Sequence, residues 1–303
     1  MRRRFFVIAN PGAGVAGTPL VEEVLRLLQA AGATLTSTRP ADSAAARQAA
    51  REAMAVGGYD AVVAAGGDGT IRQVAAGLQG GDTALGIVPA GTGNVLAHEI
   101  GLAPTPGEVA RMLLEGPVAK VACARANGEP FLLMVGAGFD ARVLSTLDQR
   151  LKSRVGKLAY AGPLLGALIR PIDALSVAVD GRPHAASWVV VANARHYGGR
   201  FVLAPRTGIL ERGLEAILFK ARSRAALAGQ LLSLAAGRLG PRAARGEDVE
   251  ILPCSHVSVS AHYPVPTQID GDLFATTPLE VDAGTAELRL IVPARRPTGP
   301  RAR

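Results

Sequence analysis

The stretch Ala61-Val62-Val63-Ala64-Ala65-Gly66-Gly67-Asp68-Gly69-Thr70 joins an apolar run to a glycine turn. Its first half is an unbroken run of small and β-branched apolar residues, which is typical of a strand buried on both faces. Its second half is a glycine turn, and a short helix is predicted from Ile71 to about Leu78. A turn between a buried strand and a helix presents its backbone amides at the positive end of the helix dipole. The stretch therefore predicts a phosphate-binding edge of a wound sheet.

The same succession of strand, turn and helix occurs on both sides of this stretch. Strands are predicted at Arg4–Ala9 and Leu85–Val88, and each leads into a glycine-bearing turn. Helices are predicted at Pro19–Ala31 and Ser43–Val56 from their capping residues and end signals. Repeated units of this kind predict a parallel sheet with crossover helices, whose ligand edge is the set of turns after the strands.

From about Lys120 the pattern changes to short strands separated by turn residues. A strand pair around Asn127-Gly128 is predicted at Val118–Ala126 and Phe131–Val135. Further strands are predicted at Leu175–Val179, Ser187–Ala192, Glu215–Phe219, Val249–Ile251 and Val257–Ser260, with helical stretches near Phe139–Arg150 and Arg224–Leu239. This part of the chain predicts an antiparallel β domain interrupted by two helical stretches.

A chain of 303 residues is long enough for two cores. We expect an α/β nucleotide-binding domain at residues 1–120 and a β domain at residues 121–285. The final apolar run, Ala286–Val292, is predicted to return to the first domain, so that residues 286–303 complete it.

The formal net charge of +8 suits a nucleic acid, an anionic membrane surface or a phosphorylated substrate equally well. Aromatic residues make up only 4% and do not alternate with basic runs, so a nucleic-acid partner is not expected. Cys123 and Cys254 lack metal-ligand spacing and are interpreted as free thiols. The longest apolar stretch, Leu158–Ile169, falls short of the roughly 20 residues that span a bilayer. We expect a cytoplasmic protein that contacts lipid from the surface.

The glycine turn has a composition that suits a bound phosphate. Gly66, Gly67 and Gly69 let the backbone approach a phosphate closely, and Thr70 adds a hydroxyl. Asp68 would repel a phosphate unless a cation lay between them, so it predicts either a bound Mg²⁺ or an orienting hydrogen bond. A tight strand-to-helix turn with Asp68 as a cap is the structural alternative.

Two further turns repeat this arrangement. Gly91, Thr92, Gly93 and Asn94 follow the next predicted strand, and Asn10 opens the turn after the first strand. Neighbouring parallel strands that each end in such a turn make a shared phosphate-binding edge.

The first turn also fits the G-x-G-x-x-G pattern of a redox dinucleotide site through Gly12, Gly14 and Gly17. Thr38-Arg39-Pro40 occupies the place where an acidic ribose contact is expected, with Asp42 slightly late, so this reading is disfavoured. No Walker A sequence occurs.

The chain contains six motifs in a specific order: Asn10-Pro11, the GGDGT turn, Gly91–Asn94, Gly136–Asp140 as GxGxD, Asn193 with Tyr197-Gly198-Gly199 and Ala204-Pro205, and Gln268–Asp272 as a variant of QxDGE. In this order and spacing they resemble the diacylglycerol kinase catalytic-domain family of bacterial lipid kinases, which also includes sphingosine and ceramide kinases. The resemblance covers nearly the whole chain, and the agreement of six motifs makes it specific.

The resemblance implies a fold and a reaction. The fold is an N-terminal parallel-sheet domain like those of phosphofructokinase and NAD kinase, followed by an antiparallel β-sandwich domain. The reaction is ATP- and Mg²⁺-dependent transfer of the γ-phosphate to a hydroxyl of diacylglycerol or a related lipid, which enters a cleft between the domains. A lipid substrate and peripheral contact with a membrane surface follow from this, and a homodimer is compatible with it.

The resemblance also implies roles for individual residues. Asp270 takes the position of the general base, Asp68 is the second catalytic residue, and Asp68 and Asp272 are the implied metal ligands. The implied nucleotide contacts are Asn10, Gly66, Gly67, Gly69, Thr70, Gly91, Thr92, Gly93 and Asn94. Without the other motifs, Asp270-Gly271 would be interpreted as a solvated hairpin turn.

Three positions depart from the family pattern. Val95 stands where the family has an aspartate after GTGN, and Asp272 stands where it has a glutamate. Glu211-Arg212-Gly213-Leu214 replaces an Asp-Asp-Gly-Leu segment at which some relatives bind a structural Mg²⁺. Because Arg212 carries the opposite charge, we expect that metal site to be absent or altered.

Two alternative functions remain at this level. An NAD kinase shares GGDGT, although Gly136–Asp140 and the pattern from Asn193 to Pro205 count against it. A catalytically silent nucleotide or lipid sensor would keep the fold, and Val95 and Arg212 leave it open. The segment Lys152–Ile172 mixes basic and apolar residues and fits either a membrane-contacting surface or a buried helix with a basic edge.

Overall fold

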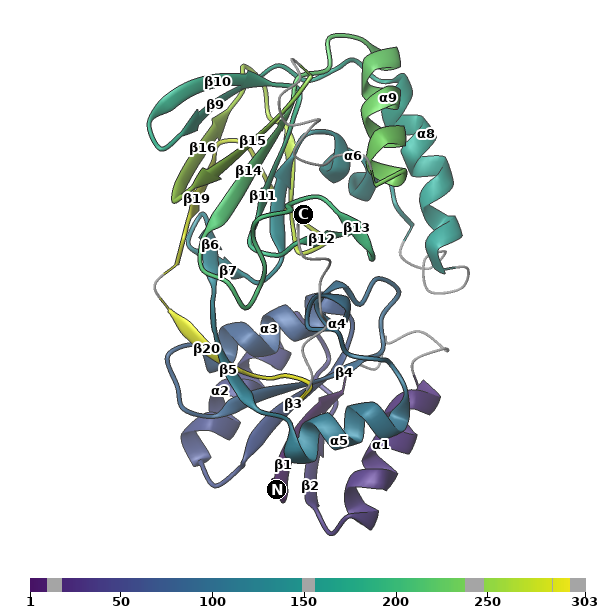
Figure 1. Ribbon diagram of the computed structural model, residues 1–303, viewed down its shortest axis with the longest axis vertical. Coiled ribbons are helices and arrows are strands. Elements are labelled where there is room, and N and C mark those ends of the chain that lie inside the picture. Colours follow the sequence, from purple (N-terminus) through teal and green to yellow (C-terminus); the bar gives the residue numbers. More distant parts are fainter. Residues whose placement is uncertain (10–17, 149–155, 238–247, 285, 295–303) are drawn as a thin grey trace, which may run out of the picture. The chain divides into compact units, whose positions relative to one another are not determined.

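The computed structural model describes residues 1–9, 18–148, 156–237, 248–284 and 286–294 (Figure 1). It divides into two units, one formed by Met1–Val121 with Ala286–Arg303 and the other by Ala122–Thr285. The first unit contains a sheet of parallel strands, and the second contains antiparallel sheets. The α/β fold class predicted from the sequence is therefore confirmed.

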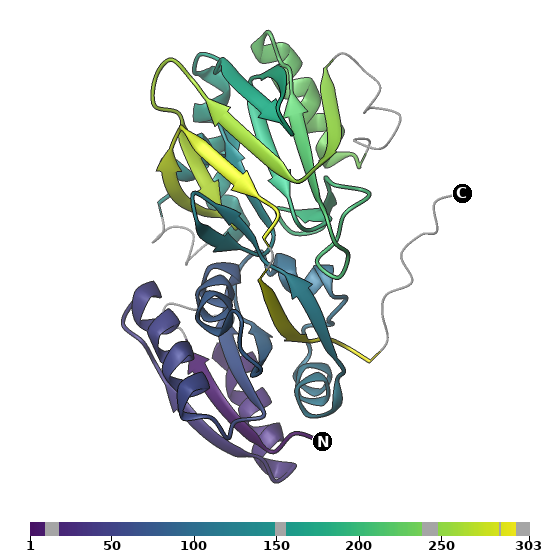
Figure 2. The ribbon, with the colours of Figure 1, turned by 90° about the vertical axis from the view of Figure 1, so that its left-hand side faces the viewer.

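The first unit is built on a six-stranded sheet with the order β2-β1-β3-β4-β20-β5. Its strands are β1 (Arg4–Ala9), β2 (Thr34–Thr38), β3 (Ala61–Gly66), β4 (Ala84–Pro89), β5 (Val118–Ala122) and β20 (Glu287–Ile291). Every residue of β3 and β4 is buried, because both faces of these central strands are covered. In Figure 2, β20 in dark yellow lies in this sheet beside β5 in teal, and it pairs in parallel with β4.

Helices connect the strands of this sheet. They are α1 (Thr18–Ala30), α2 (Ser43–Val56), α3 (Asp68–Leu78), α4 (Val95–Glu99) and α5 (Pro106–Glu115). The helix predicted to begin at Ile71 begins three residues earlier, so Asp68, Gly69 and Thr70 form its first turn. α3 packs closely on α2 at Gly77, where a Cβ atom would lie 2.5 Å from the carbonyl oxygen of Arg47.

The second unit contains two six-stranded sheets, with the orders β10-β9-β16-β19-β6-β7 and β15-β14-β11-β8-β17-β18, and the short pair β12-β13. The strands are β6 (Ala124–Ala126), β7 (Glu129–Phe131), β8 (Met134–Ala137), β9 (Leu175–Val179), β10 (Arg182–Ala186), β11 (Trp188–Ala192), β12 (His196–Tyr197), β13 (Phe201–Val202), β14 (Leu214–Phe219), β15 (Val249–Cys254), β16 (His256–Ser260), β17 (Pro266–Ile269), β18 (Asp272–Thr276) and β19 (Leu279–Asp282). Val177 and Val257 of the first sheet share one buried cluster with Val189 and Ala216 of the second. The two sheets therefore pack face to face as a β-sandwich.

The described part of this unit also contains the short helical elements α6 (Phe139–Ser145), the 3₁₀ helix η1 (Gly156–Tyr160), α8 (Ala161–Ile169) and α9 (Arg224–Ala235). α6 contacts β8, β17 and β18 of the second sheet, and α8 contacts both α6 and α9. Figure 1 shows α8 and α9 side by side on the outside of this sheet. Within the described ranges, every helix is too short or too polar to cross a bilayer.

The predicted strand pair Val118–Ala126 and Phe131–Val135 was wrong in its extent. The first run is divided at Cys123 into β5 and β6, which belong to different sheets. The hairpin at Asn127-Gly128 joins β6 to β7 and contains three residue pairs. Beyond Phe131 the chain leaves the first sheet of the sandwich and enters β8 of the second, so residues 131–135 do not form one strand.

Candidate active site

The turn between β3 and α3 has no room for side chains at its glycines. Gly66 closes β3, and a Cβ atom there would lie 2.7 Å from Oγ1 of Thr70. Gly67 is the N-cap of α3 and has an extended backbone. Thr70 is buried beneath the turn, where it packs against Gly66 and cannot present its whole side chain to solvent.

Asp68 joins this turn to the next one along the sheet. Its Oδ2 accepts a hydrogen bond from the backbone amide of Val95 at 3.0 Å, and its Oδ1 accepts one from Leu96 at 3.1 Å. These amides belong to the first turn of α4, which follows β4. Asp68 thus provides the orienting hydrogen bonds predicted as one alternative, and the cap that it forms is on α4 rather than on its own helix.

The turn after β4 is held by the side chain of Asn94. This residue has a left-handed backbone with φ of 47°, and its Oδ1 accepts a hydrogen bond from the amide of Gly91 at 2.8 Å. Its Nδ2 donates to the carbonyl oxygens of Gly91 at 2.9 Å and Pro89 at 3.3 Å. These contacts all lie within the turn, so Asn94 shapes the predicted nucleotide edge from inside it.

The two turns touch through their backbones. A Cβ atom on Gly91 would lie 2.5 Å from Cα of Gly67, and the amide of Ala90 donates to the carbonyl oxygen of Gly66 at 2.9 Å. A Cβ atom on Gly93 would lie 3.4 Å from Oδ2 of Asp68. The structure therefore brings the predicted residues of both turns together at one edge of the sheet.

Two predicted nucleotide contacts differ from this group. Thr92 is exposed, whereas Gly91, Gly93 and Asn94 around it are partly buried. Asn10 and the glycines of the first predicted turn lie outside the described residues.

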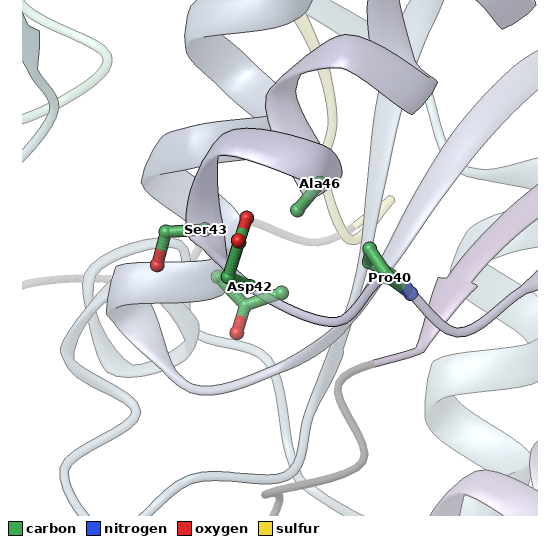
Figure 3. Close-up of a pocket in the computed structure, with 5 residues that line it drawn as sticks. Pro40, Asp42, Ser43 and Ala46 are labelled. Atoms are coloured by element: carbon green, nitrogen blue, oxygen red, sulfur yellow. The ribbon is translucent and has the colours of Figure 1, made fainter.

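A small hollow lies beside Thr70, between α3 and the N-terminus of α2 (Figure 3). Pro40, Asp42, Ser43 and Ala46 complete its lining, and Oδ1 of Asp42 caps α2 by accepting from the amide of Ala45 at 2.8 Å. Its volume of about 100 Å³ is well below the roughly 300–1,000 Å³ of ligand pockets, so it is too small for a nucleotide.

Asp270 lies in the turn that joins β17 to β18. Asp270 and Gly271 have φ of 48° and 85°, which is the pattern of a two-residue type I′ hairpin turn. The solvated hairpin turn, which was the alternative interpretation of Asp270-Gly271, is not observed, because Asp270 is only 6% exposed. Its Oδ1 accepts from the amides of Leu133 and Met134, and its Oδ2 accepts from Leu132, each at 2.9 Å. The carboxylate therefore holds the segment that connects β7 to β8.

Asn193 holds the same segment from its carbonyl side. Its Nδ2 donates to the carbonyl oxygens of Leu132 at 2.8 Å and Ala122 at 3.1 Å, and its backbone amide donates to Leu133 at 2.8 Å. Two motif residues that are far apart in the sequence thus fix one short stretch of backbone. The sequence motif contains Asn193 but does not indicate that this side chain holds the segment.

Asp140 is buried next to Gly136, where a Cβ atom would lie 2.2 Å from Oδ2 of the carboxylate. Its Oδ1 accepts from the amide of Ala141 at 2.8 Å, and its Oδ2 accepts from Nε2 of Gln268 at 3.0 Å. Burial raises the pKa of Asp140 to about 6, although these hydrogen bonds act in the opposite direction. The carboxylate of Asp140 therefore lies directly over Gly136, which explains why the first position of GxGxD is a glycine.

Gln268 connects Asp140 to the turn that contains Asp270. While its Nε2 donates to Asp140, its Oε1 accepts from the amide of Gly271 at 2.9 Å. The motifs contain both Gln268 and Asp140, but their sequence pattern does not indicate a role for either residue. The amide of a glutamine side chain can donate one hydrogen bond and accept another at the same time. The presence of a glutamine two residues before Asp270 is therefore the sequence feature that could have suggested this bridge.

Two family models match the chain. One, described as the diacylglycerol kinase catalytic domain, matches residues 4–126, and the other, the YegS C-terminal NAD kinase beta sandwich-like domain, matches residues 133–292. The chain therefore belongs to the diacylglycerol kinase family of lipid kinases, whose two domains these models describe. The recognition made from the six motifs is therefore confirmed.

Relatives of this lipid kinase carry consistent names. It is 29% identical over 252 residues to a diacylglycerol kinase of Mycobacterium tuberculosis, covering 78% of each chain. It is 32% identical over 204 residues to a probable YegS-like lipid kinase of Pseudomonas aeruginosa, covering 64% of this chain and 65% of the relative. Among the first curated relatives, the matched part spans between 54% and 78% of their length.

A solved structure has the same fold. A putative diacylglycerol kinase of Bacillus anthracis superposes with a TM-score of 0.78 at 20% identity, with 96% of this chain and 95% of that chain covered. At this identity the likeness shows the fold alone.

The implied metal ligands of this lipid kinase lie in different units. Asp68 is in the first unit, and Asp272 is the half-buried first residue of β18 in the second. Among the described residues, no group of three or more His, Cys, Asp or Glu side chains is placed to hold a metal ion.

The segment that departs from the family's structural metal site, Glu211–Leu214, lies at the surface up to Gly213. Oε1 of Glu211 lies 3.6 Å from Nη2 of Arg195, so an ion pair with a cationic side chain forms where relatives would present carboxylates to a metal. The expectation that this metal site is absent or altered stays a prediction.

Proposed function

We propose that this lipid kinase uses ATP and Mg²⁺ to transfer the γ-phosphate to a hydroxyl of diacylglycerol or a related lipid. The observation that carries the proposal is the joined pair of turns after β3 and β4, where Gly67 and Gly91 meet without side chains and Asp68 ties the turns together. A bare backbone at the carboxyl ends of neighbouring parallel strands is where α/β proteins bind phosphorylated ligands.

The same edge fits a hydrated cation. A carboxylate has about four lone-pair sites, so two backbone amides on Asp68 are compatible with a further contact to Mg²⁺ or to one of its waters. Bound there, Mg²⁺ would neutralise the charge of the transferring phosphate. Asp272 is the second proposed ligand of Mg²⁺. Its side chain is shorter than the glutamate of the family pattern, which favours a contact to the metal through a water molecule.

Asp270 is the proposed general base. In the proposed reaction the lipid hydroxyl oxygen attacks the γ-phosphorus, the bond to the bridging oxygen of ADP breaks, and the hydroxyl proton passes to the Asp270 carboxylate. Three backbone amides hold that carboxylate in one orientation, which is the positioning that a base requires. Because its substrate is insoluble, the proposed enzyme works as a peripheral protein at the cytoplasmic surface of a membrane.

Transfer of label tests the proposal. The purified chain is incubated with γ-labelled ATP, Mg²⁺ and dispersed lipids, including diacylglycerol, a glycerophospholipid and a long-chain base, with NAD in a parallel reaction. We expect label in a lipid, and we expect Asp68→Asn to reduce it by about 100-fold or more. Asp82→Asn is the matched control, because Asp82 is an exposed acid of the same unit that pairs with Arg289.

Two results would contradict the proposal. Label that moves only to NAD would identify an NAD kinase. An absence of transfer to every acceptor, with ATP still bound, would favour a catalytically silent sensor. Both alternatives were left open by the sequence, and the same reaction separates them.

A further inference from the structure

The helices on the outside of the second unit expose apolar side chains instead of burying them. Leu158 in η1 is 78% exposed, Leu165 and Ile169 in α8 are each 64% exposed, and Leu232 in α9 is 70% exposed. Phe201 in β13 is 42% exposed. α8 contacts α9, and α9 contacts β13, so these side chains lie on neighbouring elements (Figure 1). We call this set the apolar face.

α8 consists only of apolar residues and glycine, yet most of its residues are at least partly exposed. Ala161, Leu165 and Ile169 recur at every fourth position and form one stripe, and all three are exposed. Ala167, on the opposite side, is the one buried residue of the helix. A globular protein normally turns such a stripe toward its core, so an outward stripe indicates a binding surface.

The apolar face is bordered by positive charge. The segments 156–172, 195–210 and 222–237, which contain η1, α8, α9 and β13, include seven lysines and arginines but no aspartate or glutamate. Two of the seven, Arg195 and Arg206, pair with Glu211 and Glu215, which lie just outside these segments. Arg170, Arg200, Arg222 and Arg224 are exposed. The buried acid that follows α8, Asp173, is paired with Arg142, with 2.7 Å between its Oδ2 and Nε.

Two of these arginines are placed where they do not help their own helix. Arg222 and Arg224 flank Ser223, the N-cap of α9, and the positive end of the helix dipole disfavours cations there. Folding of α9 therefore does not explain their position. An anionic group facing this end of the helix would be attracted by both side chains.

We propose that the apolar face docks on a membrane that contains anionic lipids, with its leucines in the interface and its arginines on the lipid phosphates. Apolar residues together with a basic patch give the two signals that stable peripheral attachment requires. A second copy of the chain fits less well, because a symmetric dimer through this face would bring arginines against arginines. The inference rests on the proposed function in one respect: a lipid substrate gives the enzyme a reason to bind a membrane.

Vesicle sedimentation without ATP tests the proposal. The intact chain is mixed with vesicles of phosphatidylcholine alone or of equimolar phosphatidylcholine and phosphatidylglycerol. We expect binding to the anionic vesicles, and Leu165→Asn with Ile169→Asn should weaken it by about tenfold or more. Val56→Asn with Val118→Asn changes two exposed valines of the first unit and should bind like the unaltered chain.

A second pair of variants tests the charge. Arg222→Gln with Arg224→Gln should weaken binding to anionic vesicles by about fivefold for each arginine and should reduce its sensitivity to salt. Arg26→Gln with Arg111→Gln is the control, because both arginines are exposed in the first unit and pair with neighbouring glutamates. All the changed residues are exposed, so unchanged melting temperatures are expected.

Several results would overturn the proposal. These are equal binding by the Leu165/Ile169 variant and the unaltered chain, equal binding to neutral and anionic vesicles, and no binding to either. A concentration-dependent dimer that the same variant dissociates, without vesicle binding, would assign the face to a second copy. Because the assay contains no ATP, vesicle binding without transfer to any lipid would refute only the proposed function, and transfer without vesicle binding would refute only this inference.

Discussion

The two aspartates that the motifs single out, Asp68 and Asp270, are both bound by backbone amides, yet their surroundings differ. Asp68 is half-buried and accepts from two amides at the start of α4. Asp270 is buried and accepts from three amides, those of Leu132 and Leu133 between β7 and β8 and that of Met134 at the start of β8. Each is thus a structural residue as well as a proposed catalytic one. The loss of activity in a variant does not by itself separate these two tasks.

The turns around these aspartates are also held in different ways. The turn of Asp68 is fixed by contact between the backbones of Gly67 and Gly91. The turn of Asp270 is fixed by the side chain of Gln268, which is bound in turn to a buried carboxyl group on Asp140. The first arrangement should respond to added volume, and the second should respond to pH and to lost hydrogen bonds.

The largest effect is expected at Asp270. Asp270→Ala leaves three backbone amides without their acceptor in a buried place, and the free energy of unfolding should fall by about 3–5 kcal/mol, measured by denaturant unfolding. Asp180→Ala is the matched control. Asp180 also has a left-handed backbone and binds the amides of Ser255 and His256, but it lies at the surface, so a loss of about 1 kcal/mol is expected. Equal losses would show that burial does not set the difference.

A slightly smaller effect is expected from the titration of Asp140. Its folded pKa of about 6 lies above the ordinary value of 3.8, so the folded state binds a proton more tightly than the unfolded state does. This contribution to stability is fully present below pH 4 and is lost as the pH rises through 6, by about 3 kcal/mol. Asp140→Asn should remove that slope, which denaturant unfolding between pH 4 and 7 would reveal. A variant that keeps the slope would assign it to other groups.

Added volume at the first pair of turns should have an intermediate effect. Gly91→Ala places a methyl group against the Cα atom of Gly67, where only backbone could move, and about 2 kcal/mol of stability should be lost. Gly67→Ala is the control within the same contact, because its methyl group would lie 3.4 Å from Cα of Gly91. Thermal unfolding of both variants compares them. If the two losses are the same, close contact does not fix these turns.

The smallest change in stability is expected at Asp68. Asp68→Asn keeps one acceptor oxygen for the start of α4, so the loss should be about 1 kcal/mol, measured by thermal unfolding. Phosphoryl transfer should fall much further, because a neutral amide attracts Mg²⁺ poorly. If the lost stability accounts for the whole loss of activity, Asp68 acts only as the cap of α4.

Much of the first unit could be predicted because its signals are local. The helix Ser43–Val56 has its cap, its apolar spacing and its glycine stop within one short stretch, and it was predicted with the bounds observed. The strand at Ala61–Gly66 and the glycine turn after it are equally self-contained. The prediction failed at Val118–Ala126 because a continuous β-forming run does not reveal that its two halves join different sheets.

The family, the parallel and antiparallel halves and the glycine turns after β3 and β4 could be predicted from the sequence, because each depends on residues that are close in the chain. The hydrogen bonds of Asp68 and Asp270 are visible only in the tertiary structure. Asp68 binds amides 27 and 28 positions away, and Asp270 binds amides up to 138 positions away. The outward stripe of α8 is a further case, since its spacing is that of a core helix and only its neighbours leave it exposed. Hydrogen bonds and burial between distant segments arise from packing, which local patterns do not encode.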